Sequence, residues 1–150
     1  MIAYPDTSFL YAMYRLQAHS AAAATHIKSM REKLHVSSLL LYEFRQSLRW
    51  QEFLFLRDRR KGFDRASRLS IAADLESDLE AGALQIVEAD WREVFRTAER
   101  LSDAFTASEG HRTLDILHVA TALHFGARDF LTFDANQRKL ARAEGLNVPL

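Results

Sequence analysis

Cysteine is absent from the 150-residue sequence, so disulfide bonds and cysteine-ligated metal sites are excluded. Glycine and proline are scarce, at 5 and 2 residues, and 48% of the residues are hydrophobic against 27% charged, which is typical of a globular chain. The N-terminus has no signal-peptide pattern, and no apolar run approaches the roughly 20 residues of a membrane span. We therefore expect a cytoplasmic protein that does not associate with membranes.

An excess of charge of either sign is also missing, because 20 Lys and Arg residues balance 20 Asp and Glu residues. Such a chain cannot hold nucleic acid by bulk charge. However, 16 of the basic residues are Arg and only 4 are Lys, and Arg matches the geometry of phosphate better than Lys does. Any nucleic-acid contact would therefore come from a local patch. The basic turn RDRRK, from Arg57 to Lys61, is either such a patch or a solvated helix end.

Short apolar segments alternate with helical patterns along the chain. Strands are predicted at residues 2–5, 33–36, 84–87, 130–133 and 146–148. Helices are predicted at residues 8–17, 21–32, 63–81, 91–105, 114–125 and 136–144, and a longer one begins at Ser37 or Ser38 and ends near Arg57. This alternation indicates the α/β class, with a central parallel sheet of four to five short strands flanked by helices. The length predicts one domain over residues 1–150.

Two acidic residues follow predicted strands directly. Asp6 comes one residue after the first strand, and Asp134 one residue after the strand at 130–133. In parallel sheets ligands bind beyond the carboxyl ends of the strands, so both residues are candidates for a site. Each is also a plausible helix N-cap, and the segment from Asp134 to Gln137 matches a capping box.

Two further carboxylates lie in apolar helices. Glu43 is the only charged group in the segment LLLYEF, and Asp115 begins a helix whose remainder is nearly all apolar. Taken singly, an Arg partner or the helix dipole explains each. Four carboxylates beside buried segments are harder to explain, because carboxylates are rarely buried unless paired or metal-bound. A hard divalent cation such as Mg²⁺ or Mn²⁺ would relieve their repulsion and would drive phosphodiester hydrolysis by activating water.

Four segments in order resemble the PIN domain family. They are DTS at residues 6–8, Glu43, RTLDILHVATA at residues 112–122, and FLTFD at residues 130–134. Within that family, the size and the lack of extra domains resemble the VapC-type ribonuclease toxins of toxin–antitoxin pairs. The resemblance covers essentially the whole chain, and it implies a three-layer fold and a Mg²⁺-dependent endoribonuclease in which Mn²⁺ is a plausible substitute.

The resemblance also implies an acidic pocket of Asp6, Glu43, Asp115 and Asp134, which would be both the catalytic residues and the metal site. Asp6 and Asp115 would be direct ligands, and Glu43 and Asp134 would act partly through water. One departure concerns Pro5, which stands where the family commonly carries an aliphatic residue and which bears on how Asp6 is aimed.

Five further residues in or near these segments have two interpretations each. Thr7, like Ser8 beside it, is an N-cap or helps to orient a metal-bound water. Thr132 hydrogen-bonds within the pocket or is an ordinary strand residue. Arg112 contacts the scissile phosphate or is a solvated surface residue. His118 has ligand spacing from the acidic helix, but we expect a structural or supporting role for it.

The predicted helices up to Arg57 and over residues 63–81 are more apolar than one buried stripe requires. The surplus predicts a protein interface, and the resemblance implies a homodimer and a cognate antitoxin as partners, besides the RNA substrate. A phosphatase of the haloacid dehalogenase type is set aside because Ser8 stands where its second Asp is needed. A non-toxin or non-catalytic PIN-like module that binds RNA or protein remains the alternative.

Overall fold

A four-stranded parallel sheet forms the centre of the chain, for which the computed structural model describes residues 2–150. Its strands are β1 Ala3–Pro5, β2 Leu34–Val36, β3 Leu84–Ile86 and β4 Asp129–Leu131, in the order β3-β2-β1-β4. The predicted α/β class is confirmed, and the sheet has four strands, within the predicted range of four to five. The segment at 146–148 contributes only a parallel bridge between Asn147 and Asp129, at the edge of β4.

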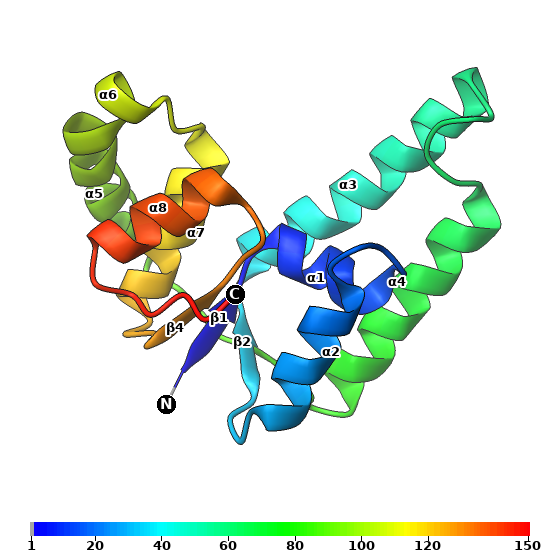
Figure 1. Cartoon of the computed structure of the whole chain (residues 1–150), viewed down its shortest axis with the longest axis horizontal. Coiled ribbons are helices and arrows are strands. Elements are labelled where there is room, and N and C mark those ends of the chain that lie inside the picture. The colour runs from blue at the N-terminus through cyan, green and yellow to red at the C-terminus, as the bar shows by residue number, and fades with distance from the viewer. Residues whose placement is uncertain (1) are drawn as a thin grey trace.

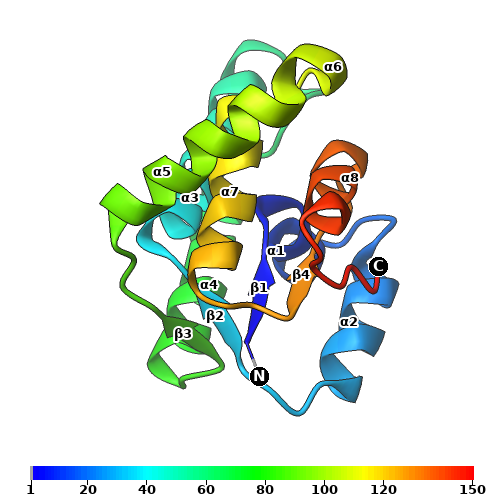
Figure 2. The same cartoon turned by 90° about the vertical axis from the view of Figure 1, so that its left-hand side faces the viewer.

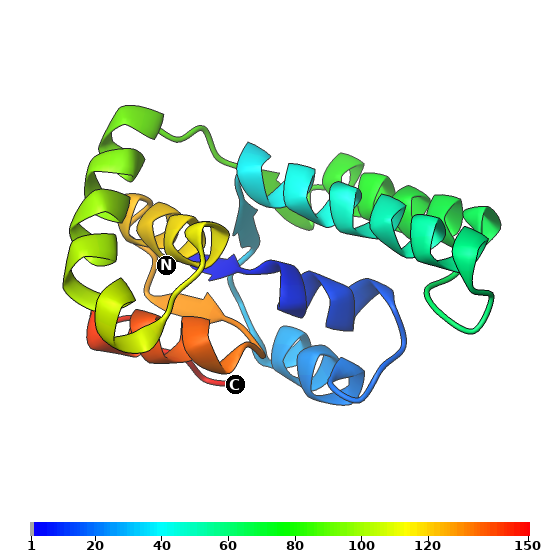
Figure 3. The same ribbon diagram turned by 90° about the horizontal axis from the view of Figure 1, so that it is seen from above.

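Helices cover both faces of this sheet, so the molecule has three layers (Figures 1 and 3). They are α1 Thr7–Tyr14, α2 Ser20–Ser29, α3 Ser38–Arg57, α4 Arg65–Glu80, α5 Trp91–Leu101, α6 Ala107–Glu109, α7 Thr113–His124 and α8 Ala135–Ala143. In Figure 1, α1 to α4 lie on one side of the strands, and α5 to α8 lie on the other. The predicted helix over 91–105 is interrupted, because a π-helical turn, η1 Ser102–Thr106, follows α5.

The longest helix, α3, follows the sequence prediction closely. Ser37 is its N-cap and accepts a hydrogen bond from the backbone N–H of Leu40, and Arg57 is its last residue. Gly62 then closes the turn to α4 with φ 62°. A Cβ at Gly62 would lie 2.0 Å from the carbonyl oxygen of Gln51, so only glycine fits there. The α3–α4 hairpin therefore projects as an arm from the sheet (Figures 1 and 3).

The most buried helix is α7, in which every residue from 115 to 122 is buried. It packs between α5 and α8, next to a core that includes the large side chains of Tyr4, Phe44 and Phe130 (Figure 2). This burial brings Asp115 and His118, two polar residues, into the interior. Among residues 2–150, no helix combines the length and the apolar character that crossing a membrane requires.

The strand predicted at residues 130–133 lies at residues 129–131 in the structure, so Asp134 is farther from the end of the strand than predicted. β4 ends at Leu131, whose carbonyl oxygen accepts a hydrogen bond from Asp6 N at 3.0 Å. Because β1 ends at Pro5 and the chain then turns into α1, residues beyond Leu131 have no strand to pair with. Asp134 thus stands three residues past the strand rather than one.

Candidate active site

The four carboxylates singled out by the sequence come from four elements near the carboxyl ends of β1 and β4. Asp6 follows β1, Glu43 is in α3, Asp115 is in the first turn of α7, and Asp134 is the N-cap of α8. Asp6 and Asp115 are buried, whereas the side chains of Glu43 and Asp134 are 24% and 29% exposed. The group therefore has a closed inner half and an open outer half.

Asp6 has the geometry of a helix cap and of a site residue at once. Its Oδ1 accepts hydrogen bonds from Phe9 N at 2.9 Å and from Ser8 Oγ at 2.6 Å, and its Oδ2 accepts one from Thr132 Oγ1 at 2.5 Å. The predicted capping of α1 by Thr7 or Ser8 is wrong, because the N-cap is Asp6, whose carboxylate accepts from the backbone N–H of Phe9. Burial raises the pKa of Asp6, and these hydrogen bonds offset only part of that effect.

Thr132 joins the two strand ends. Its hydroxyl donates to Asp6 and accepts a hydrogen bond from Asp134 N at 2.9 Å. A second link runs from Phe133 N to Ser8 Oγ at 2.9 Å. Of the two interpretations of Thr132, the structure has the hydrogen-bonded one: the residue is fully buried beyond the end of β4 and fixes the turn before α8 against the turn before α1.

Gln137 is a site residue that the sequence analysis did not identify. Asp134 caps α8 by accepting from Gln137 N at 2.9 Å, but the Gln137 side chain does not complete the predicted capping box. It donates from Nε2 to Asp115 Oδ1 at 3.2 Å instead. Gln137 is only 5% exposed and lies on the face of α8 that also buries Leu140 and Ala141. Leu140 and Ala141 follow Gln137 by three and four positions, and this helical spacing in the sequence could have indicated that Gln137 is buried.

Glu43 is held from two sides at the rim of the site. Its Oε2 accepts hydrogen bonds from the Thr7 hydroxyl and, at 2.5 Å, from His118 Nε2. The other ring nitrogen of His118 lies 3.3 Å from the Tyr4 hydroxyl, which is bonded to Ser37. Burial alone would raise the pKa of Glu43, but the hydrogen bonds from His118 and Thr7 keep it below its ordinary value.

His118 therefore lies behind Glu43 as a supporting residue. It is 1% exposed, and both of its ring nitrogens are within reach of protein groups. With Nε2–H donating to Glu43, Nδ1 is left to accept from the Tyr4 hydroxyl. Burial raises the pKa of Tyr4, so its hydroxyl stays protonated and available as that donor.

Arg112 lies across the open half of the site. Its Nε is 2.9 Å from Asp115 Oδ2, and one terminal nitrogen is 3.7 Å from Asp134 Oδ2. The hydrogen bond to Asp115 and the surrounding negative charge, including that of Glu43, raise the pKa of Arg112. Its side chain is 74% exposed, so the guanidinium bridges two carboxylates from the solvent side.

The donor set fits a hard divalent cation, although it is not arranged as a finished metal site. Across residues 2–150, no three His, Cys, Asp or Glu side chains are close enough together to hold a metal ion. Carboxylate and hydroxyl oxygens are nevertheless the ligands that Mg²⁺ and Mn²⁺ prefer. Two further observations agree with such an ion. Asp6 is buried and forms no ion pair with any described residue. Gln137 Oε1 is a buried acceptor that has no hydrogen-bond partner among residues 2–150.

The basic turn between Arg57 and Lys61 lies at the far end of the α3–α4 arm, away from the carboxylates (Figure 1). The guanidinium of Arg57 lies 3.5 Å from the centre of the Phe53 ring, and Arg60 pairs with Asp58 at 3.1 Å. Arg59 also lies 5.2 Å from the centre of the Phe55 ring, so three basic groups of the turn are engaged within the chain, and contact of this turn with RNA stays a prediction.

Solved structures with a similar fold include a toxin and a toxin–antitoxin complex. The VapC20 toxin of Mycobacterium tuberculosis, described as cleaving the sarcin–ricin loop, superposes with a TM-score of 0.67 at 16% identity, over 97% of this chain and 96% of that one. PAE2754 from Pyrobaculum aerophilum gives 0.61 at 21% identity, over 99% and 89%. VapBC2 from Rickettsia felis, bound to a promoter DNA fragment, gives 0.64 at 15% identity, over 99% and 97%.

A comparison with curated proteins gave no match. At the identities of the solved structures, the likeness establishes the fold alone. The sequence itself, however, matches the PIN domain family over residues 3–143, nearly its entire length. The protein is therefore a member of the PIN domain family.

Proposed function

We propose that this PIN-domain protein is a Mg²⁺-dependent endoribonuclease and the toxin of a VapBC-type toxin–antitoxin pair. The observation that carries the proposal is the convergence of Asp6, Glu43, Asp115 and Asp134 from four separate elements, with the exposed guanidinium of Arg112 paired to two of them. A merely structural cluster would not need an open side lined by carboxylates.

In this proposal Asp6 and Asp115 would hold the cation directly, and Glu43 and Asp134 would act partly through water. Mg²⁺ is the expected ion, and Mn²⁺ can replace it. A bound ion of this kind supplies an activated water and stabilises negative charge on the phosphate. The buried Gln137 amide, which already donates to Asp115, keeps that carboxylate oriented.

The remaining polar residues act by positioning and charge. The hydroxyls of Ser8 and Thr132 fix both oxygens of Asp6, and His118 and Thr7 fix Glu43. Arg112 is free to leave Asp115 once a cation takes over the negative charge, because its side chain is mostly exposed. It then pairs with the scissile phosphate through its planar fork.

An antitoxin and a second copy of the chain are the proposed protein partners. The α3–α4 arm carries large apolar side chains in solvent: Trp50, Leu56 and Leu69 are 52%, 71% and 50% exposed. Trp50 also stacks on Phe53 with ring centres 4.7 Å apart. Exposed apolar surface of this kind marks interaction sites. Toxin–antitoxin complexes among the similar folds, from Rickettsia felis and Klebsiella pneumoniae, support an antitoxin as a partner, and the cytoplasm is the expected location.

The test is RNA cleavage by purified protein in EDTA and after addition of Mg²⁺ or Mn²⁺. We expect no cleavage in EDTA, recovery with either ion, and loss of activity in Asp115→Asn, which keeps the size but removes the charge. Glu88→Gln is the matched control, because Glu88 is exposed and the described residues offer it no ion pair. Full activity in EDTA would refute the metal mechanism. Absence of cleavage with intact RNA binding would favour the non-catalytic module.

The toxin assignment has its own readout. Expression of the chain alone is expected to arrest bacterial growth, and Asp115→Asn at equal expression is expected to relieve the arrest. A wild-type chain that cleaves RNA in vitro but leaves growth unaffected would indicate a PIN nuclease that is not a toxin.

A further inference from the structure

Three aromatic rings form a stack that runs from the core to the surface beside the acidic site. Phe133 stacks on Phe9, with ring centres 6.0 Å apart and planes 13° apart, and His19 stacks on Phe133 at 4.4 Å and 9°. Phe9 is fully buried, Phe133 is half-buried and His19 is exposed. The outermost member of the stack is thus a flat ring in solvent.

The stack is held together by segments that are distant in sequence. Phe9 belongs to α1, His19 stands just before α2, and Phe133 lies in the turn between β4 and α8. The connection from α1 to α2 passes beside the start of α8 (Figure 2). Phe133 N donates to Ser8 Oγ, and Ser8 Oγ donates to Asp6. The ring platform is therefore fixed directly to the candidate active site.

A cleft of about 310 Å³ opens between these rings and Asp134. It is lined by Ser8, Tyr11, Gln17, His19, Phe133 and Asp134. Its volume is at the lower end of the range for small-ligand sites, roughly 300–1,000 Å³. One wall is aromatic and another contains Asp134, one of the four carboxylates.

The chemistry of this cleft fits a nucleobase. Bases of single-stranded nucleic acid stack on aromatic side chains, and their edges are recognised by hydrogen bonds. The outward face of the His19 ring offers the platform, and Phe133 beneath it holds that ring in place. The exposed amide of Gln17 can donate to and accept from a base edge. We propose that this cleft binds an unpaired nucleobase next to the scissile phosphate of single-stranded RNA, an inference that rests on the proposed ribonuclease function.

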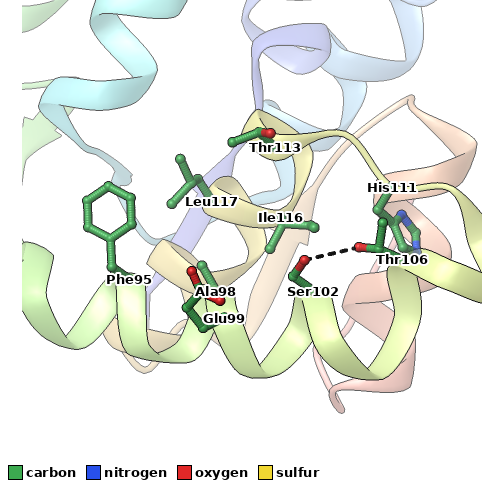
Figure 4. Close-up of a pocket in the computed structure, with 9 residues that line it drawn as sticks. All are labelled: Phe95, Ala98, Glu99, Ser102, Thr106, His111, Thr113, Ile116 and Leu117. Carbon is green, nitrogen blue, oxygen red and sulfur yellow. Dashed lines mark hydrogen bonds between the residues drawn. The ribbon is translucent and has the colours of Figure 1, made fainter.

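A second cavity, of about 290 Å³, serves as the internal comparison. It lies between α5, η1 and α7, where Phe95, Ser102, Thr106 and His111 are among its lining residues (Figure 4). Like the first cleft, this cavity is lined by an exposed aromatic side chain, because Phe95 is 55% exposed. Unlike the first cleft, it is lined by none of the four carboxylates. A base bound there would not lie beside the reacting phosphate.

The experiment measures binding of a single-stranded oligoribonucleotide that carries 2-aminopurine, whose fluorescence falls when the base stacks. It is done in EDTA, so that cleavage does not interfere, and at low ionic strength, which favours RNA binding. Base–aromatic stacking contributes about 1–3 kcal/mol per base, so His19→Ala is expected to weaken binding by about 5- to 150-fold. His19→Phe should retain both the affinity and the quenching, and Phe95→Ala should bind as the wild type does.

His19 is exposed and its side chain makes no capping hydrogen bond to α2, so the alanine variant is expected to fold; a thermal melt checks this. Gln17→Glu, which brings a negative charge to the same cleft, is a second variant that should weaken binding. Unchanged binding in His19→Ala, or an equal loss in Phe95→Ala, would overturn the inference.

Cleavage in Mg²⁺ is measured separately on the same oligonucleotide. RNA that is cut by the wild type but bound independently of His19 would overturn only the base site. Binding that depends on His19, without cleavage, would support the base site and overturn only the ribonuclease function. A wild-type chain that fails to bind the oligonucleotide would overturn the base site whether or not cleavage occurs.

Discussion

Replacement of Asp6 by Asn and by Ala separates its role as a helix cap from its role in the acidic site. In the structure, Asp6 Oδ1 accepts from Phe9 N and Ser8 Oγ, and Oδ2 accepts from Thr132 Oγ1. Asn keeps the Oδ1 acceptor, and the Thr132 hydroxyl can rotate to accept from its amide. Ala loses all three contacts.

The stability difference between the two variants follows from these contacts, because both lack the charge. Loss of the cap costs about 1 kcal/mol, and each lost hydrogen bond about 1 kcal/mol. The metal-free Asp6→Ala protein should therefore be about 2–3 kcal/mol less stable than Asp6→Asn. For a chain of this size, that corresponds to a difference in Tm of roughly 4–12 °C.

The pH dependence of the Asp6→Asn variant has a definite sign. Burial raises the pKa of Asp6 in the folded state above its ordinary value of 3.8, so folding favours the protonated form. This contribution is fully present below the unfolded pKa and is lost as the pH rises through the folded pKa. At neutral pH the metal-free Asp6→Asn protein should melt at or above the wild-type temperature, and the difference should shrink as the pH falls toward 3.8.

Cleavage should follow the charge rather than the cap. We expect Asp6→Asn to be nearly as inactive as Asp6→Ala in an RNA cleavage assay with Mg²⁺, because a neutral amide is a poor ligand for a hard cation. Asp134→Asn, which also preserves a cap, should reduce cleavage less severely. If Asp6→Asn cuts RNA at the wild-type rate, or melts as low as Asp6→Ala, the reasoning is wrong.

Three further predictions use the same assays. Glu43→Gln should reduce cleavage far more than Glu88→Gln. Because the folded protein lowers the pKa of Glu43, Glu43→Gln should also be less stable than the wild type at neutral pH. This difference in stability should disappear as the pH falls below the ordinary pKa of 4.5. Equal cleavage by both would make Glu43 an ordinary helix residue. Arg112→Ala should raise the KM for RNA and should not increase the amount of Mg²⁺ required, because Arg112 pairs with the proposed ligand Asp115 in the absence of the ion; an unchanged KM would refute its phosphate contact. Gly62→Ala should lower Tm strongly, since its Cβ would meet the Gln51 carbonyl at 2.0 Å; an unchanged Tm would contradict the turn geometry.

The local structure of the chain could be predicted from the sequence. The capping of α3 by Ser37 and its end at Arg57 depend on hydrogen bonds and spacing within a few residues, which the sequence displays directly. The strands and helices are likewise visible as local patterns, and their alternation predicted the parallel sheet. The four carboxylates were also identified from their immediate neighbours, although their catalytic roles stay predictions.

The arrangement of the site was decided by the tertiary structure. The bond between Thr132 and Asp6 joins residues 126 positions apart, and it exists only because β4 pairs with β1 in one register. That pairing also ends β4 early and places Asp134 three residues beyond it. The link from Gln137 to Asp115 depends in the same way on how α8 packs against α7.

The contacts of the side chains around the carboxylates were also decided by the tertiary structure. The sequence showed His118 in an apolar helix, but only the folded chain brings its two ring nitrogens within reach of Glu43 and Tyr4. Likewise, His19 and Phe133 have no relation in sequence and become a stacked pair in the fold. Periodicity and capping act between near neighbours, so they are encoded locally. Contacts between distant residues depend on strand register and helix packing, which only the folded chain fixes.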